Sequence, residues 1–157
     1  MAKELAIPDN ELRALDVLNR EAVKYLLIGS LAMRFYGASR EVRDVDLLTE
    51  TSPINAERLL RAIEELVGHP LVFSAEDLAR SRKKVNLRND GYDLDILTSV
   101  DGLEFDAAYQ NRETAVEGSV VVPVVSKDDL LFIKRRAAKD EKRCAKELAD
   151  ISFLESG

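Results

Sequence analysis

The chain has one cysteine and no tryptophan among its 157 residues. A single cysteine, Cys144, can form no internal disulfide, which is typical of proteins from a reducing compartment. Because aromatic residues make up only 6% of the chain, the core must depend on leucine, valine, isoleucine and alanine. No apolar run approaches the roughly 20 residues of a membrane-spanning helix, and the first residues lack the apolar segment of a signal peptide. We therefore expect a cytoplasmic protein without a membrane partner.

The sequence also lacks an excess of positive charge. Its formal net charge of -6 argues against wide, nonspecific binding of nucleic acid, which depends on many lysine and arginine contacts. Local basic clusters at 80–88 and 134–146 could meet an RNA acceptor or form solvated helix surfaces, and both readings stay open. A P-loop is excluded because its glycine and lysine pattern is absent. Residues 86–97 are not an EF-hand loop, because the glutamate at its twelfth position is missing.

The length and composition of the chain are sufficient for one domain with a sizeable core. Hydrophobic residues make up 46% of the 157 residues, an ordinary fraction for a globular protein. No repeat, linker or low-complexity segment interrupts the sequence. We expect a single domain over residues 1–157, with a core over about 22–125 and C-terminal helices over about 126–155. The order of elements predicts an α/β (α+β) fold, with a mixed β-sheet flanked by helices and a C-terminal helical tail.

Short apolar runs and turn residues predict the individual elements. Helices are expected from Asp9 as N-cap, over 31–36, from Ser52 to Gly68, from Ser74, over 105–109, and from Ser126 to Phe153 with a break near Asp140. Strands are expected over 25–28, 42–48, 85–88, 92–97 and 119–125. Pro123 predicts that the last strand lies at an edge of the sheet or that its pairing ends there.

Asp44 and Asp46 lie one residue apart in the predicted strand over 42–48. Alternate side chains of a strand share a face, so both carboxylates should point the same way, opposite to Val45 and Leu47. Neighbouring carboxylates repel each other when ionised, and a divalent cation between them removes that cost. Such oxygen ligands suit Mg²⁺ together with substrate phosphates. A strand with an acidic solvent face is the simpler alternative, although aspartate is infrequent in strands.

Gly29 and Ser30 connect the predicted strand over 25–28 to the predicted helix over 31–36. Glycine lets the backbone approach an anion closely, and Ser30 can donate both its hydroxyl and its N–H. The partial positive charge at the start of a helix adds to the attraction for phosphate. The same two residues could also form an ordinary turn with Ser30 as N-cap.

A later predicted strand carries two more aspartates, Asp93 and Asp95, which share a face. If this strand lies beside the strand of Asp44 and Asp46, one of its carboxylates joins the first pair. Three carboxylates can hold two metal ions, which clamp the attacking and leaving oxygens of a displacement. The third carboxylate could also accept the proton of the attacking hydroxyl.

These residues together resemble the DNA polymerase beta-type nucleotidyltransferase superfamily. Its signature is an apolar strand, a Gly-Gly or Gly-Ser step, a short helix, two aspartates in an apolar strand and a later acidic residue. The closer resemblance is to a small bacterial branch related to AbiEii-type abortive-infection toxins and minimal nucleotidyltransferases. It covers most of residues 25–155, and it departs from the branch at Val42 and Glu147, where threonine and aspartate are usual. The segments that carry it are 26–30, 40–47, 94–98, 122–134 and 146–150.

The resemblance implies a nucleotidyltransferase that moves an NMP group from an NTP to an acceptor hydroxyl. It assigns Asp44, Asp46 and Asp95 to catalysis and to the binding of two Mg²⁺ ions, and it assigns Gly29 and Ser30 to the triphosphate. The acceptor implied is an RNA, a protein or a small molecule.

Arg40 and Lys134 are assigned to nucleotide binding by the same resemblance. Arg40 could instead be a surface partner of Glu41 or Asp44. Lys134 could instead be a solvated helix lysine, because the charge density around it is high.

Two functions of other kinds also stay open at this stage. The fold could serve as a non-catalytic, antitoxin-like partner of a toxin protein, because small members of this superfamily often pair with another protein. An antibiotic nucleotidyltransferase is the third alternative, but it needs an acceptor pocket that no segment of the sequence identifies.

Overall fold

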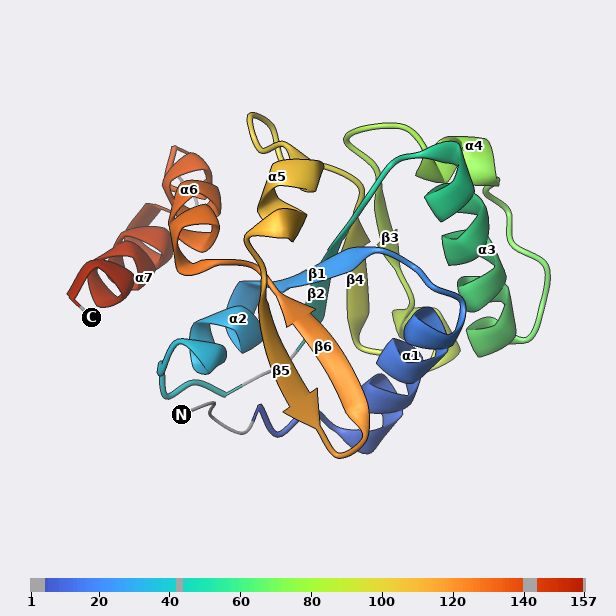
Figure 1. Cartoon of the computed structure of the whole chain (residues 1–157), viewed down its shortest axis with the longest axis horizontal. Coiled ribbons are helices and arrows are strands. Elements are labelled where there is room, and N and C mark those ends of the chain that lie inside the picture. Colours follow the sequence, from blue (N-terminus) through green and yellow to red (C-terminus); the bar gives the residue numbers. More distant parts are fainter. Residues whose placement is uncertain (1–4, 42–43, 140–143, 157) are drawn as a thin grey trace.

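A computed structural model of the chain describes residues 5–41, 44–139 and 144–156. Its centre is a mixed six-stranded sheet with the order β3-β4-β2-β1-β6-β5 (Figure 1). The strands are β1 Tyr25–Ile28, β2 Val45–Thr49, β3 Lys84–Asn86, β4 Leu94–Leu97, β5 Glu113–Glu117 and β6 Val120–Val124. The helices are α1 Asp9–Arg20, α2 Gly29–Phe35, α3 Pro53–Val67, α4 Ala75–Leu78, the short 3₁₀ helix η1 Arg88–Asp90, α5 Phe105–Gln110, α6 Lys127–Ala137 and α7 Cys144–Ser156.

Strand pairing at the centre of the sheet positions the acidic residues. β2 pairs antiparallel with β1, where Ile28 lies opposite Asp46. β2 pairs parallel with β4 on its other side, where Asp46 lies opposite Asp95. The C-terminal end of β1, Asp46 and Asp95 therefore lie side by side across three neighbouring strands. This pairing confirms the expectation that the two aspartate strands are adjacent.

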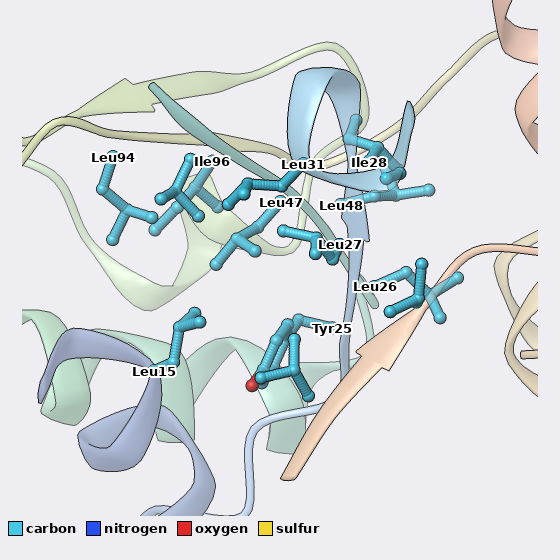
Figure 2. Packing of buried hydrophobic residues seen from close by; sticks show 14 of the residues in the cluster. Leu15, Tyr25, Leu26, Leu27, Ile28, Leu31, Leu47, Leu48, Leu94 and Ile96 are labelled. Atoms are coloured by element: carbon cyan, nitrogen blue, oxygen red, sulfur yellow. The ribbon is translucent and has the colours of Figure 1, made fainter. Parts of the chain in front are cut away.

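The hydrophobic core lies between the sheet and the pair of helices α1 and α3, which lie together on the side of the sheet away from α6 and α7 (Figure 1). Figure 2 shows Leu15 of α1 pointing toward the side chains of β1, β2 and β4. Leu27, Leu47 and Ile96 are fully buried in this layer. Each buried side chain of this size stabilises the fold by about 1.5–3 kcal/mol relative to exposure, so the central strands are held firmly beneath the site.

The helical tail belongs to the same folded unit as the sheet. α6 packs against α7, and Leu130 of α6 together with Ile151 and Leu154 of α7 joins the hydrophobic core. Ser126 caps α6 by accepting a hydrogen bond from the backbone N–H of Asp129 at 3.1 Å, as predicted. The expected break near Asp140 lies outside the described residues. Over the part of the chain described here, every helix is too short or too polar to cross a bilayer.

The structure corrects two strand predictions. β6 is not an edge strand, because it lies between β1 and β5, a strand that the sequence did not indicate. Pro123 lies opposite Thr114 of β5, and the contact with β1 begins only at Val124. Pairing with β1 is therefore confined to the residues that follow the proline, because proline has no N–H to donate.

Two further boundaries differ from the sequence expectation. Asp44 precedes β2 rather than lying within it, and the expected start of the strand at Val42 lies outside the described residues. Asp9 is the first residue of α1 rather than its N-cap, and the N-cap position is held by Pro8. The carboxylate of Asp44 is consequently placed by the segment before β2, not by strand alternation.

Candidate active site

The site begins where Gly29 follows β1. Its φ is +71°, and a Cβ atom at this position would lie 2.3 Å from Oδ2 of Asp46. Only glycine combines a left-handed φ with so close an approach without strain. The backbone at the start of α2 is therefore packed directly against the Asp46 carboxylate.

Asp46 is a partly buried carboxylate with an altered affinity for protons. Burial raises its pKa to about 6, and the nearby carboxylates of Asp95 and Asp44 add to the increase, whereas Lys84 and Lys134 oppose it. Within the described residues, Asp46 has no hydrogen-bond or ion-pair partner. Among the described residues, no cation thus compensates the negative charge of Asp46 by direct contact.

Asp95 lies beside Asp46 on β4 and is buried. Its Oδ1 accepts a hydrogen bond of 2.7 Å from Nδ2 of Asn86, the residue opposite it on β3. Its Oδ2 lies 3.2 Å from Nη2 of Arg88 and 4.0 Å from Nζ of Lys84. Asp93, the alternative third carboxylate, is exposed. The geometry therefore favours Asp95 over Asp93 as the partner of Asp46.

Asp44 reaches the same place from the segment before β2. Its Oδ1 lies 2.9 Å from Nη2 of Arg88, the nitrogen that also contacts Asp95. One guanidinium thus bridges two of the three carboxylates. The pKa of Arg88 is raised by its hydrogen bond to Asp44 and by the charge of Asp95.

Two pockets meet at Asp46. A cavity of about 550 Å³ is lined by Gly29, Asp46 and Asp95 on one side and by Lys84 and Lys134 on another. A smaller cavity of about 370 Å³ is lined by residues around the start of α2 and β2, which are Ser30, Arg40, Glu41, Asp44, Asp46 and Lys146. The carboxylates therefore face two separate spaces, each of which has cationic side chains in its wall.

Arg40 lies in the wall of the smaller pocket, but its direct partner is a residue of the tail. It forms an ion pair with Asp150 of α7, in which Nη1 donates to Oδ2 at 3.1 Å. The expected pairing with Glu41 or Asp44 is wrong. A basic side chain of the pocket is thus connected to the C-terminal helix.

Lys134 is buried, so the prediction of a solvated helix lysine is wrong. Its Nζ lies 3.0 Å from Asp150 and 3.3 Å from Glu147. Burial raises the pKa of Asp150, but hydrogen bonds from Arg40 and Lys134 outweigh this effect and hold the pKa below its ordinary value. We call these four residues the tail ion cluster; they are Arg40, Lys134, Glu147 and Asp150.

The acidic residues fit a divalent cation by their chemistry. Arg88 contacts both Asp44 and Asp95, Asp46 lies opposite Asp95 on the neighbouring strand, and Asp46 lacks a compensating partner within the described residues. Magnesium prefers such oxygen ligands and completes its shell with phosphates and water. Among the described residues, no three acidic, histidine or cysteine side chains are placed so that they could hold a metal ion together; Arg88 bridges Asp44 and Asp95 instead.

The sequence reasoning did not identify Asn86 and Arg88 as site residues. The Asp-Gly turn at 90–91 could have indicated Asn86, because a tight hairpin places it opposite Asp95. Arg88 was read only as part of a basic run. Its contact with Asp44 joins two segments far apart in the sequence, which no local pattern predicts.

Comparisons with known proteins agree with this architecture. Residues 9–153 match the family described as nucleotidyl transferase of unknown function (DUF2204). A solved structure with a similar fold belongs to a Thermotoga maritima protein proposed to be a nucleotidyltransferase; it has 20% sequence identity and a TM-score of 0.53. The similarity covers 92% of this chain and 90% of that chain, and at this identity it shows the fold alone. A comparison with curated proteins gave no match.

Proposed function

The chain belongs to this family of nucleotidyl transferases, and on that premise we propose that it transfers an NMP group from an NTP to an acceptor hydroxyl. The observation that carries the proposal is the register that places Asp46 opposite Asp95, with the Gly29 backbone packed against the Asp46 carboxylate. The resemblance to AbiEii-type toxins stays a prediction.

The proposed reaction needs a stabilised phosphate and an acceptor hydroxyl that loses its proton. The acceptor oxygen forms a bond to the α-phosphorus, the bond to pyrophosphate breaks, and the hydroxyl proton passes to Asp95 or to solvent. Asp44, Asp46 and Asp95 would hold Mg²⁺, which when bound supplies positive charge to the attacking and leaving oxygens. The strands β2 and β4 keep the carboxylates of Asp46 and Asp95 in place, so that little reorganisation is required of these two residues.

The two pockets suit the two substrates. The smaller pocket contains Ser30, Arg40 and Lys146, whose hydroxyl, guanidinium and ammonium groups can bind phosphate oxygens. The larger pocket is lined by Asp95 together with the cationic residues Arg82, Lys84 and Arg136. We assign the smaller pocket to the triphosphate and the larger one to the acceptor.

Label transfer tests this function directly. The protein is incubated with each α-labelled NTP, Mg²⁺, and either pooled cell RNA or pooled protein, and labelled products are separated by electrophoresis. We expect transfer by the natural protein and at least a 100-fold loss in Asp46→Asn, a magnitude typical of the removal of one electrostatic catalytic group. Asp44→Asn should behave in the same way.

Asp93→Asn is the matched control for this experiment. Asp93 is an exposed carboxylate two residues before Asp95, and its change should leave transfer nearly unaltered. Full transfer by Asp46→Asn would contradict the proposal. No transfer by the natural protein with any NTP or acceptor pool would favour the non-catalytic partner module.

A further inference from the structure

Arg88 occupies an unusual place among the acidic residues. It lies in η1, the turn between β3 and β4, and its side chain reaches back to the carboxylates. Its Nη2 lies 2.9 Å from Oδ1 of Asp44 and 3.2 Å from Oδ2 of Asp95. A single nitrogen therefore contacts one oxygen from each of two carboxylates, one from the segment before β2 and one from β4.

The orientation of Asp95 does not depend on Arg88. Nδ2 of Asn86 donates to the other oxygen, Oδ1, at 2.7 Å, and the backbone of Asp95 is fixed by pairing on both sides of β4. If the guanidinium left, Asn86 would still direct Oδ2 of Asp95 toward the site. That oxygen would then be available as a ligand together with Oδ1 of Asp44.

The Arg88 side chain is only partly enclosed by its partners. It is 47% exposed, whereas the side chains of Asp44 and Asp95 are 34% and 7% exposed, so water reaches the guanidinium more readily than it reaches the carboxylates. The turn that carries it is held by its backbone, since the N–H of Arg88 donates to Oδ1 of Asn86 at 2.8 Å. Displacement of the guanidinium therefore requires no change in the turn.

We propose that Arg88 is a stand-in cation that competes with a divalent metal ion for Asp44 and Asp95. The proposal rests on the proposed function, because it assumes that these carboxylates are metal ligands. Without metal, the guanidinium offsets the repulsion between the carboxylates. When a divalent cation binds, the Arg88 guanidinium must leave Oδ1 of Asp44 and Oδ2 of Asp95. Because breaking these two contacts costs free energy, metal binding is weaker than it would be without Arg88.

The sign of one mutational effect separates competition from a purely structural role. If Arg88 only held the carboxylates together, Arg88→Gln would weaken metal binding. If Arg88 competes with the metal, the same change tightens it. We expect Mn²⁺ to bind Arg88→Gln about tenfold more tightly than the natural protein, on the scale of a partly screened charge at short range. The measurement is a titration of the full chain with Mn²⁺ by calorimetry, without nucleotide and at constant ionic strength.

Lys84→Gln is the matched control for the loss of charge. Nζ of Lys84 lies 4.0 Å from Oδ2 of Asp95. The Lys84 side chain is more exposed than that of Arg88 and, within the described residues, forms no ion pair with Asp44. Removing the Lys84 ammonium changes the electrostatic field at the carboxylates, but the Arg88 guanidinium still bridges Asp44 and Asp95. The affinity for Mn²⁺ should therefore rise by less than about threefold. Asp44→Asn should abolish the binding of Mn²⁺ that the titration measures. This result would show that the measured Mn²⁺ binds at these carboxylates.

The proposal would be overturned by equal affinity in Arg88→Gln and the natural protein, by weaker binding in Arg88→Gln, or by an equal rise in Lys84→Gln. Absence of Mn²⁺ binding in all variants would also overturn it, since no metal would then be competing. Should Arg88→Gln fail to fold, Arg88→Lys must show a rise of the same sign, because the shorter lysine cannot bridge both carboxylates. Tighter Mn²⁺ binding by Arg88→Gln, without label transfer by the natural protein, would support the competition between Arg88 and the metal. That result would reject only the proposed nucleotidyl transfer.

Discussion

At the scale of single residues, the contact between Gly29 and Asp46 joins backbone conformation to the chemistry of the site. The glycine has a left-handed φ and leaves no room for a side chain, because the carboxylate occupies that space. The need for glycine thus has two separate causes, one conformational and one steric.

The two causes can be separated by a pair of alanine substitutions. Gly68→Ala places a side chain at a φ of +76° with no atom within 4 Å, whereas Gly29→Ala adds a clash with Asp46 at a φ of +71°. We expect Gly68→Ala to cost about 1 kcal/mol of stability and Gly29→Ala to cost about 2–4 kcal/mol and to abolish label transfer. Urea unfolding gives the stabilities. Equal costs for the two variants would show that Asp46 does not crowd Gly29.

The raised pKa of Asp46 leads to a prediction about pH. Because the folded-state pKa of about 6 exceeds the ordinary 3.8, the folded protein binds this proton more tightly than the unfolded chain, and stability falls as pH rises through this window. Asp46→Asn removes that penalty. At about pH 7.5 with EDTA, the variant should be more stable by about 1–2 kcal/mol, a value reduced for partial exposure.

The same comparison at low pH provides its control. Near about pH 3, Asp46 is protonated in the folded protein and largely so in the unfolded chain, so the gain should nearly vanish. Urea unfolding across this range measures the difference. A variant that is no more stable than the natural protein at the higher pH would contradict the account of Asp46.

At the scale of elements, the tail ion cluster joins α6 and α7 to the segment before β2. Arg40 and Lys134 share the carboxylate of Asp150, which is only 2% exposed. Loss of one member leaves buried charge without its partner, which is costly. The cluster therefore fixes the tail against the smaller pocket.

Two carboxylates of α7 allow a matched test of this cluster. Asp150→Asn should destabilise the protein by roughly 2–4 kcal/mol, because two cations lose their shared charge. Glu155→Gln removes an ion pair with Arg135 in which both side chains are more than half exposed, and it should cost less than about 1 kcal/mol. Chemical unfolding of both variants gives the values. A small cost for Asp150→Asn would show that packing alone holds the tail.

The helices and strands also show which parts of the fold can be predicted from sequence patterns. β1 and the caps at Ser52, Ser74 and Ser126 follow from local chemistry and were predicted correctly. The helix α2 was also expected, but it begins at Gly29, two residues before the predicted start, and its N-cap is Ile28 and not Ser30. β5 was missed because its alternating residues are mostly exposed and polar, so it depends on β6 for its definition. The burial of Lys134 was missed for a related reason, since its partners lie on another helix.

Some residues of the candidate site were likewise predicted from the sequence, and others were not. Strand alternation and apolar runs predicted that Asp93 and Asp95 share a face, the resemblance to nucleotidyltransferases assigned Asp95 to the site of Asp46, and the structure places Asp46 and Asp95 opposite each other. The bridging role of Arg88 could not be predicted, because it depends on how a turn folds back over two strands. Patterns within one element are visible in sequence, whereas contacts between distant elements are not.

At the scale of the whole molecule, the sheet, α1, α3 and the tail helices share one hydrophobic core. Such a chain should unfold in a single cooperative transition. We expect the midpoints from far-ultraviolet circular dichroism, which reports helices, and from tyrosine fluorescence, which reports the four tyrosines of the chain, to coincide in urea. An earlier loss of helix would show instead that residues 126–155 form a separately stable unit.

The central claim is that Asp44, Asp46 and Asp95 together hold a divalent cation at the junction of the two pockets. A crystal structure of the chain with Mn²⁺ and a non-hydrolysable NTP, with anomalous diffraction to locate the metal, tests it most directly. The account predicts an anomalous peak ligated by Asp46 and at least one of the other two carboxylates, with the guanidinium of Arg88 withdrawn from Asp44 and Asp95. A peak elsewhere on the chain, with Arg88 still bridging the two carboxylates, would contradict it.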